Sequence, residues 1–202
     1  MRKIVYSVAM SLDGYLAGPN GEADWIVMDP EIDFVGMMAR FDTVLMGRRT
    51  FEAVQAQGGG GSMPGVASVV VSRTLRHTDH PGLTIIAEDV GGALSRLRAG
   101  SGKDIWLFGG GSLFRSLLDL GLVDTIEVAV IPVLLGGGIP LLPARSQRTT
   151  LRLVSSKAYK ATGTLALVYA VQQKPALEPL KESTTDGTDG TDKANNNSAV
   201  FR

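Results

Sequence analysis

Short runs of apolar residues recur along the first half of the chain, and each run predicts a buried β-strand. The runs lie at residues 4–10, 43–46, 67–71, 83–87 and 104–108. They contain many β-branched residues and are too short for helices, as is typical of strands that are covered on both faces of a sheet. We therefore expect these five strands to form the centre of the fold.

Apolar residues at helical spacing separate these strands. The pattern predicts helices over about residues 30–40, after residue 47, over 90–99, and from the glycines at 109–111 to about residue 120. Asp29 and Asp89 precede the first and third of them, where a carboxylate can accept hydrogen bonds from the free amides of a helix start. Pro30 is a good first helical residue. Strands and helices thus alternate over the first 120 residues.

Beyond residue 120 the segments are richer in β-strand patterns. Residues 123–130, 151–157 and 163–172 predict three more strands, and residues 133–143 form an apolar segment interrupted by glycine and proline. The whole pattern predicts an α/β fold with three layers: a mixed sheet of about eight strands, helices on both faces, and antiparallel strands at the C-terminal end.

The composition changes abruptly near residue 174. From there the chain consists mostly of Pro, Lys, Glu, Thr, Asp, Gly and Asn, with almost nothing to bury. We therefore assign residues 1–173 to one domain and residues 174–202 to a disordered low-complexity tail. The glycine-rich residues 57–65 are expected to form a mobile loop.

Composition excludes several classes of function. The formal net charge is zero, there are no cysteines, and the two histidines, His77 and His80, lie in a polar segment. This argues against nucleic-acid binding, disulfides and a metal site. Because no apolar run is long enough to span a membrane, we expect a cytoplasmic protein.

Three glycines follow the strand at residues 104–108. Gly109, Gly110 and Gly111 allow the backbone to approach a ligand closely, and the helix that follows presents free amides and a partial positive charge. A strand that passes through glycines into a helix is therefore a candidate phosphate site. The alternative is a tight turn with no ligand.

Two other strand ends carry arginines and hydroxyls, which are donors suited to phosphate. The first reads Gly47-Arg48-Arg49-Thr50, and the second reads Ser72-Arg73-Thr74. Positive charge at a helix start opposes the helix dipole, so an anionic ligand would explain the arginines better than a bare surface. A dinucleotide with several phosphates fits three such junctions, and the arginines favour NADP over NAD.

Five segments together resemble the dihydrofolate-reductase-like superfamily, and most closely the reductase domain at the C-terminal end of riboflavin-biosynthesis enzymes, as a stand-alone bacterial member. The resemblance covers about residues 1–172. Its segments read SLDGYLA (11–17), MGRRTFE (46–52), VVVSRTL (69–75), FGGGSLFRSLL (108–118) and IPVLLGGGIPLLP (131–143).

The resemblance implies an NADPH site with a residue assignment. Gly47, Arg48 and Thr50 would bind phosphate, and Ser72 and Arg73 would flank the adenosine 2′-phosphate. The pyrophosphate would lie on the glycine turn, formed by Gly109, Gly110, Gly111 and Ser112 together with Leu113. By analogy with dihydrofolate reductases, we expect a cis peptide bond between Gly109 and Gly110.

The same resemblance points to two acids as catalytic residues. Asp13 corresponds to the aspartate that lies near nicotinamide and substrate in riboflavin-type reductases, and Glu31 lies near the position of the proton-donating carboxylate of dihydrofolate reductases. The alternatives are a turn residue for Asp13 and a helix-dipole partner for Glu31.

Three functions remain open from the sequence. The first is an NADPH-dependent reductase of a pyrimidine or pterin-like small molecule, similar to 5-amino-6-(5-phosphoribosylamino)uracil reductase. The second is a dihydrofolate reductase, and the third is a nucleotide-binding protein without turnover. The resemblance also implies a homodimer through the C-terminal strands, to which the apolar residues 133–143 would contribute unless they fold onto their own core.

Overall fold

The computed structural model describes residues 1–56, 58, 65–144 and 147–172. The predicted tail and most of the predicted mobile loop at 57–65 lie outside these residues. The order of elements along the chain agrees with the predicted alternation of strands and helices, followed by strands.

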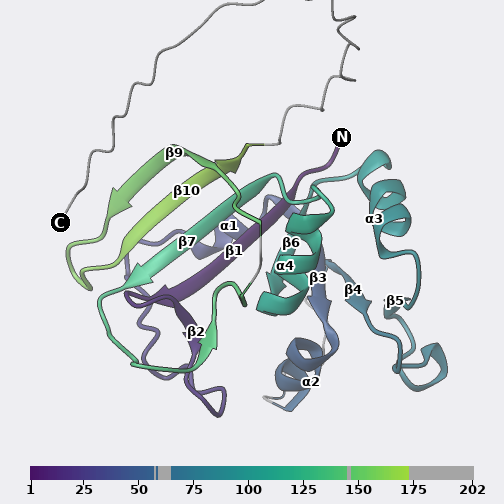
Figure 1. Ribbon diagram of the computed structural model, residues 1–202, viewed down its shortest axis with the longest axis horizontal. Helices are drawn as coiled ribbons and strands as arrows, with labels where there is room; N and C mark the ends of the chain where they lie inside the picture. The colour runs from purple at the N-terminus through teal and green to yellow at the C-terminus, as the bar shows by residue number, and fades with distance from the viewer. Residues whose placement is uncertain (57, 59–64, 145–146, 173–202) are drawn as a thin grey trace, which may run out of the picture.

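One eight-stranded sheet forms the middle layer (Figure 1). Its strands, in spatial order, are β5 (Thr84–Ile86), β4 (Ala67–Val71), β3 (Phe41–Gly47), β6 (Asp104–Gly109), β1 (Ile4–Ser11), β7 (Thr125–Ile131), β10 (Leu165–Val171) and β9 (Leu151–Ala158). A second sheet, which the sequence did not predict, pairs β2 (Tyr15–Ala17) with β8 (Ile139–Pro140).

The sheet is mixed, as predicted. All pairs from β5 to β7 are parallel, whereas β10 runs antiparallel to both β7 and β9. The parallel strands therefore end at one common edge, which lies in the lower part of Figure 1 near β2 and α2. Ligands of open α/β sheets bind at this edge, beyond the carboxyl ends of the strands.

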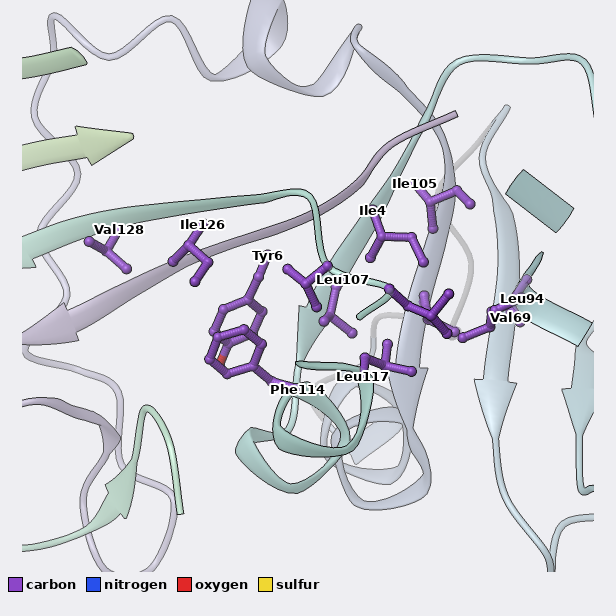
Figure 2. Packing of buried hydrophobic residues seen from close by; sticks show 13 residues of the cluster. Ile4, Tyr6, Val69, Leu94, Ile105, Leu107, Phe114, Leu117, Ile126 and Val128 are labelled. Atoms are coloured by element: carbon purple, nitrogen blue, oxygen red, sulfur yellow. The ribbon is translucent and has the colours of Figure 1, made fainter. Parts of the chain in front are cut away.

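Helices cover both faces of the sheet. They are α1 (Phe34–Met38), α2 (Arg48–Ala56), α3 (Val90–Ala99) and α4 (Gly111–Asp119), with a short 3₁₀ turn, η1 (His77–Asp79). Alternate residues of β1 belong to different cores, because side chains of a strand point to opposite faces. Tyr6 packs with Phe114 of α4 on one face (Figure 2), and Val5 belongs with Phe51 of α2 to the core on the other. The predicted three-layer α/β fold is thus confirmed.

The first predicted helix is much shorter than expected. The sequence predicted a helix over residues 30–40 capped by Asp29, but α1 spans only Phe34–Met38 and is capped by Asp33, which accepts a hydrogen bond from the Gly36 amide at 2.8 Å. The Asp29 carboxylate is instead bound by a distant segment. At the third helix the prediction is confirmed, since Asp89 caps α3 through the Gly92 amide.

The predicted cis peptide bond between Gly109 and Gly110 is wrong. No peptide bond between described residues is cis. The chain turns from β6 into α4 at Gly110, through φ +88° and ψ +98°. Because glycine has no Cβ, it adopts this positive φ without a steric penalty, so a trans bond suffices for the reversal.

Candidate functional site

Three strand ends with phosphate-binding chemistry lie side by side at the common edge. β4, β3 and β6 are neighbours in the sheet. In the register of the strands, Gly47 at the end of β3 pairs with Val71 of β4, and Met46 pairs with Gly109 of β6. The three junctions are separate in the sequence, and the topology of the sheet brings them together.

The glycine turn after β6 lies against the first turn of α2. A Cβ placed on Gly110 would lie 3.3 Å from Oγ1 of Thr50, and one on Gly109 would lie 3.6 Å from Thr50 Cγ2. A Cβ on Gly47 would lie 3.9 Å from Cβ of Leu113 in α4. The starts of α2 and α4 therefore adjoin, and these five predicted cofactor residues form one cluster.

Neither helix start is neutralised by an acid of its own first turn. The first turns of α2 and α4 contain no acidic residue, and Gly110 offers no side-chain cap to α4. Two partial positive charges thus face one region, a combination that favours an anionic ligand. Gly111 is buried and Ser112 is exposed in the first turn of α4.

Exposed arginines add to this positive charge. Arg48, Arg49 and Arg73 are all exposed. Arg48 forms a loose ion pair with Glu52 at 3.4 Å, with both side chains nearly half exposed. Such a pair contributes little stability, so its guanidinium remains available to a ligand. No hydrogen bond or ion pair joins Arg49 or Arg73 to the described part of the chain.

Ser72 has a structural role that the sequence did not reveal. It is buried, and its hydroxyl accepts hydrogen bonds from the amides of Thr74 at 3.2 Å and Leu75 at 3.1 Å. This arrangement shapes the turn after β4 and directs Arg73 outward. Ser72 therefore supports the candidate site at least through the turn that carries Arg73.

Asp13 lies in the turn that follows β1, and β1 is the neighbour of β6 in the sheet. Its carboxylate accepts hydrogen bonds from the Ser11 hydroxyl at 2.6 Å, the Gly136 amide at 2.7 Å and the Leu135 amide at 3.1 Å. These donors, Ser11 first, lower the pKa of the exposed Asp13 carboxyl below its usual value. Asp13 is thus held in its ionised form by the chain itself.

Glu31 lies apart from the glycine turns. Its side chain is 67% exposed, and its carboxylate lies 3.9 Å from the ammonium of Lys157 on β9. β9 is the strand at the far edge of the sheet, separated from β1 by β7 and β10. No described contact connects Glu31 with Gly109, Gly110 or Thr50.

Residues 140–143 pack beside the candidate site, a position that the sequence did not predict. A Cβ on Gly111 would lie 2.8 Å from the Pro140 carbonyl oxygen, 2.9 Å from Pro143 Cδ and 3.1 Å from the Leu141 carbonyl oxygen. This segment therefore packs directly on the start of α4. Glycines at 109–111 and 136–138 are typical of segments where the backbone comes close to another group. However, no local sequence pattern predicts that the two glycine-containing segments contact each other.

The described residues form neither a metal-binding cluster nor a membrane-spanning helix. They contain no cluster of three or more His, Cys, Asp or Glu that could hold a metal ion. None of their helices is long and apolar enough to cross a bilayer.

Comparison with known proteins supplies the family. Residues 2–165 match the model of the RibD C-terminal domain. The chain belongs to this family. It is 33% identical over 179 residues to the uncharacterized protein YyaP of Bacillus subtilis (strain 168), a match that covers 83% of this chain and 94% of YyaP. It is 31% identical over 161 residues to YwjB of the same organism, also uncharacterized, covering 78% and 92%.

Solved structures support the assignment to the RibD C-terminal domain family. A protein from Shewanella sp. PV-4 provisionally assigned to riboflavin biosynthesis is similar with a TM-score of 0.72 and 26% identity, over 86% of this chain and all of the other. The deaminase/5-amino-6-(5-phosphoribosylamino)uracil reductase of Thermotoga maritima matches with a TM-score of 0.63 and 15% identity, over 85% of this chain and 57% of its own. At that identity the second likeness shows the fold alone.

The predicted resemblance to riboflavin-type reductase domains is thereby confirmed. All predicted site residues lie inside the matched residues 2–165 of this RibD C-terminal domain. Their individual roles stay predictions, because a family match does not assign them.

Proposed function

We propose that this RibD C-terminal domain is an NADPH-dependent reductase. The observation that carries the proposal is the meeting of the α2 and α4 starts, where Gly110 lies next to Thr50 and neither first turn contains an acid. Two unneutralised helix starts side by side suit the two phosphates of a pyrophosphate. The family is that of the reductase domain of a riboflavin-biosynthesis protein, which agrees with this chemistry.

The residues present fit the cofactor part by part. The glycine turn (Gly109, Gly110, Gly111) with Ser112 and Leu113 would hold the pyrophosphate. Because Gly110 has no side chain, the backbone of this turn lies close to Thr50, whose hydroxyl would share the phosphate site. Gly47, Arg48 and Thr50 would bind phosphate from the α2 side. Arg73, positioned by the Ser72 turn, would pair with the 2′-phosphate that distinguishes NADPH from NADH. NADPH, when bound, supplies the hydride.

The substrate that we propose is a pyrimidine or pterin-like molecule. The pyrimidine is favoured because the chain belongs to the RibD C-terminal domain family and its motifs resemble those of 5-amino-6-(5-phosphoribosylamino)uracil reductases. Reduction would then open the ribosyl group of the substrate to a ribityl group. The contribution of the chain is to orient the substrate carbon against the nicotinamide and to exclude water.

One observation favours the non-catalytic alternative over a dihydrofolate reductase. A dihydrofolate reductase needs a free acid at its first helix and near its cofactor, but the N-cap of α1, Asp33, is bound to the Gly36 amide, and Glu31 lies beside Lys157 of β9, apart from the glycine turns. The Asp13 carboxylate likewise already accepts a hydrogen bond from the Gly136 amide. A nucleotide-binding protein without turnover needs no such acid.

A fluorescence titration with NADPH and NADH tests the proposal. We expect binding of NADPH in preference to NADH, with the preference lost in Arg73→Ala. Arg76→Ala is the matched control, because Arg76 is also exposed and follows the same turn. Binding of neither nucleotide would refute the reductase and the nucleotide-binding protein alike. NADPH binding without turnover of a phosphoribosylaminopyrimidine or a dihydropterin would favour the non-catalytic protein.

We also propose a homodimer formed through β9. All eight residues of this edge strand are exposed, although three of them are large and apolar: Leu151 at 39%, Leu153 at 52% and Val154 at 53%. An apolar strand at the edge of a sheet is an aggregation hazard unless it is protected, and pairing with a second copy of the chain is one way to cover its apolar residues. The expected contribution of residues 133–143 is smaller, since Leu141 and Leu142 pack on their own core while Leu134 remains 70% exposed.

A further inference from the structure

The Asp13 carboxylate joins two segments that are far apart in the sequence. The Leu135 and Gly136 amides donate to it from the segment that follows β7, more than 120 residues along the chain. The Ser11 hydroxyl donates to it locally, and Ser11 Oγ in turn accepts a hydrogen bond from the Tyr15 amide at 2.9 Å. Asp13 thus has donors from both sides and no described contact with the glycine turn itself.

Further backbone bonds between the same two segments extend this junction. The Leu12 amide donates to the Val133 carbonyl at 2.9 Å, and the Leu141 amide donates to the Gly14 carbonyl at 2.9 Å. The pairing of β2 with β8 adjoins the second of these bonds, with Tyr15 opposite Pro140. Among these contacts, the charge-assisted bonds to Asp13 are the strongest in kind.

The segment held in this way ends on the candidate site. Residues 140–143 lie against Gly111, close enough that a Cβ there would overlap the Pro140 carbonyl. Gly111 opens α4, whose free amides form half of the proposed pyrophosphate site. A path of direct contacts therefore runs from Asp13 through residues 135–141 to the start of α4.

We propose that Asp13 is a positioning residue, whose carboxylate fixes residues 135–136 so that residues 140–143 close over the first turn of α4. This role rests on the proposed cofactor site. It differs from proton transfer to a substrate, because an aspartate that anchors amides needs acceptor oxygens and no transferable proton. An asparagine retains one such oxygen, and its amide group can donate to Ser11 Oγ.

The test compares Asp13→Asn with Asp13→Ala. Hydrogen exchange of the Leu135 and Gly136 amides measures how firmly these amides are bound to residue 13, and the Kd for NADPH measures the integrity of the proposed cofactor site. In Asp13→Ala we expect exchange at both amides to accelerate about tenfold or more and the Kd to rise about tenfold. In Asp13→Asn we expect the Gly136 amide to stay protected and the Kd to rise by less than about threefold. Asp24→Ala, which removes an exposed carboxylate without a described partner, should change neither.

Other results would overturn the proposal. If Asp13→Asn weakened NADPH binding as much as Asp13→Ala while both amides stayed protected, the charge would act on the ligand directly. If Asp13→Ala changed neither the exchange rates nor the Kd for NADPH, the positioning role of Asp13 would be refuted. If the alanine variant did not fold, the asparagine variant would decide: weak binding with protected amides overturns the proposal, and near-wild-type binding supports it. If the wild-type chain did not bind NADPH, both the proposed function and the effect of Asp13 on a cofactor site would be overturned. The exchange data would then still test whether the Asp13 carboxylate holds the Leu135 and Gly136 amides.

Discussion

The carboxylate of Asp29 accepts two hydrogen bonds from Thr162, one from its amide at 3.1 Å and one from its hydroxyl at 2.9 Å. Asp29 also accepts the Glu31 amide at 3.0 Å, and it has no exposed surface. These bonds tie the segment before α1 to the turn between β9 and β10. Asp13, a predicted catalytic residue, and Asp29, two residues before the predicted Glu31, thus both bind backbone amides of distant segments.

Asp29 gives a pH-dependent contribution to stability. Hydrogen bonds to its ionised form, with the Glu31 amide first, lower the pKa of Asp29 in the folded chain. Its contribution is therefore complete above the pKa of an unfolded aspartate, about 3.9, and is lost as the pH falls through the lower folded value. We expect Asp29→Asn to lower the urea midpoint at pH 7, and the gap to the wild type to narrow at pH 3. A gap that is constant with pH would contradict this.

The Tyr6 hydroxyl is buried without a hydrogen-bond partner in the described structure. The ring stacks on Phe114 with centroids 3.8 Å apart, and burial raises the pKa of Tyr6, so the hydroxyl keeps its proton. Because phenylalanine keeps the ring contact and removes the unsatisfied group, Tyr6→Phe should raise the unfolding free energy by about 1 kcal/mol. Tyr169→Phe, on a half-buried ring, should change it by less than about 0.5 kcal/mol. Destabilisation by Tyr6→Phe would show that the hydroxyl has a partner.

Gly111 has no room for a side chain. An added Cβ would lie 2.8 Å from the Pro140 carbonyl oxygen, whereas at Gly109 the nearest heavy atom would be Thr50 Cγ2 at 3.6 Å, an ordinary contact. We expect Gly111→Ala to lower the unfolding free energy by about 1–3 kcal/mol, as overpacked sites do, and Gly109→Ala to lower it less. Urea titration of both variants measures the difference. Equal effects would show that residues 140–143 yield freely.

The proposed dimer can be tested at one residue of β9. Leu153→Asp would place an unpaired charge in the interface, so we expect dimer association to weaken by at least about a hundredfold. Leu120→Asp is the matched control, because Leu120 is 54% exposed and Leu153 is 52% exposed. Light scattering at micromolar concentration reports the mass. A monomeric wild type, or equal dissociation in both variants, would refute the β9 interface.

Sequence patterns predicted the central strands well because burial on both faces of a sheet leaves a local signal. β4 (Ala67–Val71) and α3 (Val90–Ala99) agree with their predicted bounds, and β6 begins at Asp104 as expected. The pattern failed between residues 29 and 40. There Asp29 and Pro30 look like a helix start, but the bonds from Thr162 commit Asp29 elsewhere.

The class of the fold and the chemistry of its strand ends can be read from local sequence patterns. Glycines, arginines and hydroxyls after three buried strands are local features, and strands of a parallel sheet must end at one edge. Tertiary structure alone decided which of them meet. Thr50 lies beside Gly110, and residues 140–143 close over Gly111. The roles of Asp13 and Asp29 depend on contacts with residues more than a hundred positions away, since a carboxylate binds whichever amides the folded backbone brings to it.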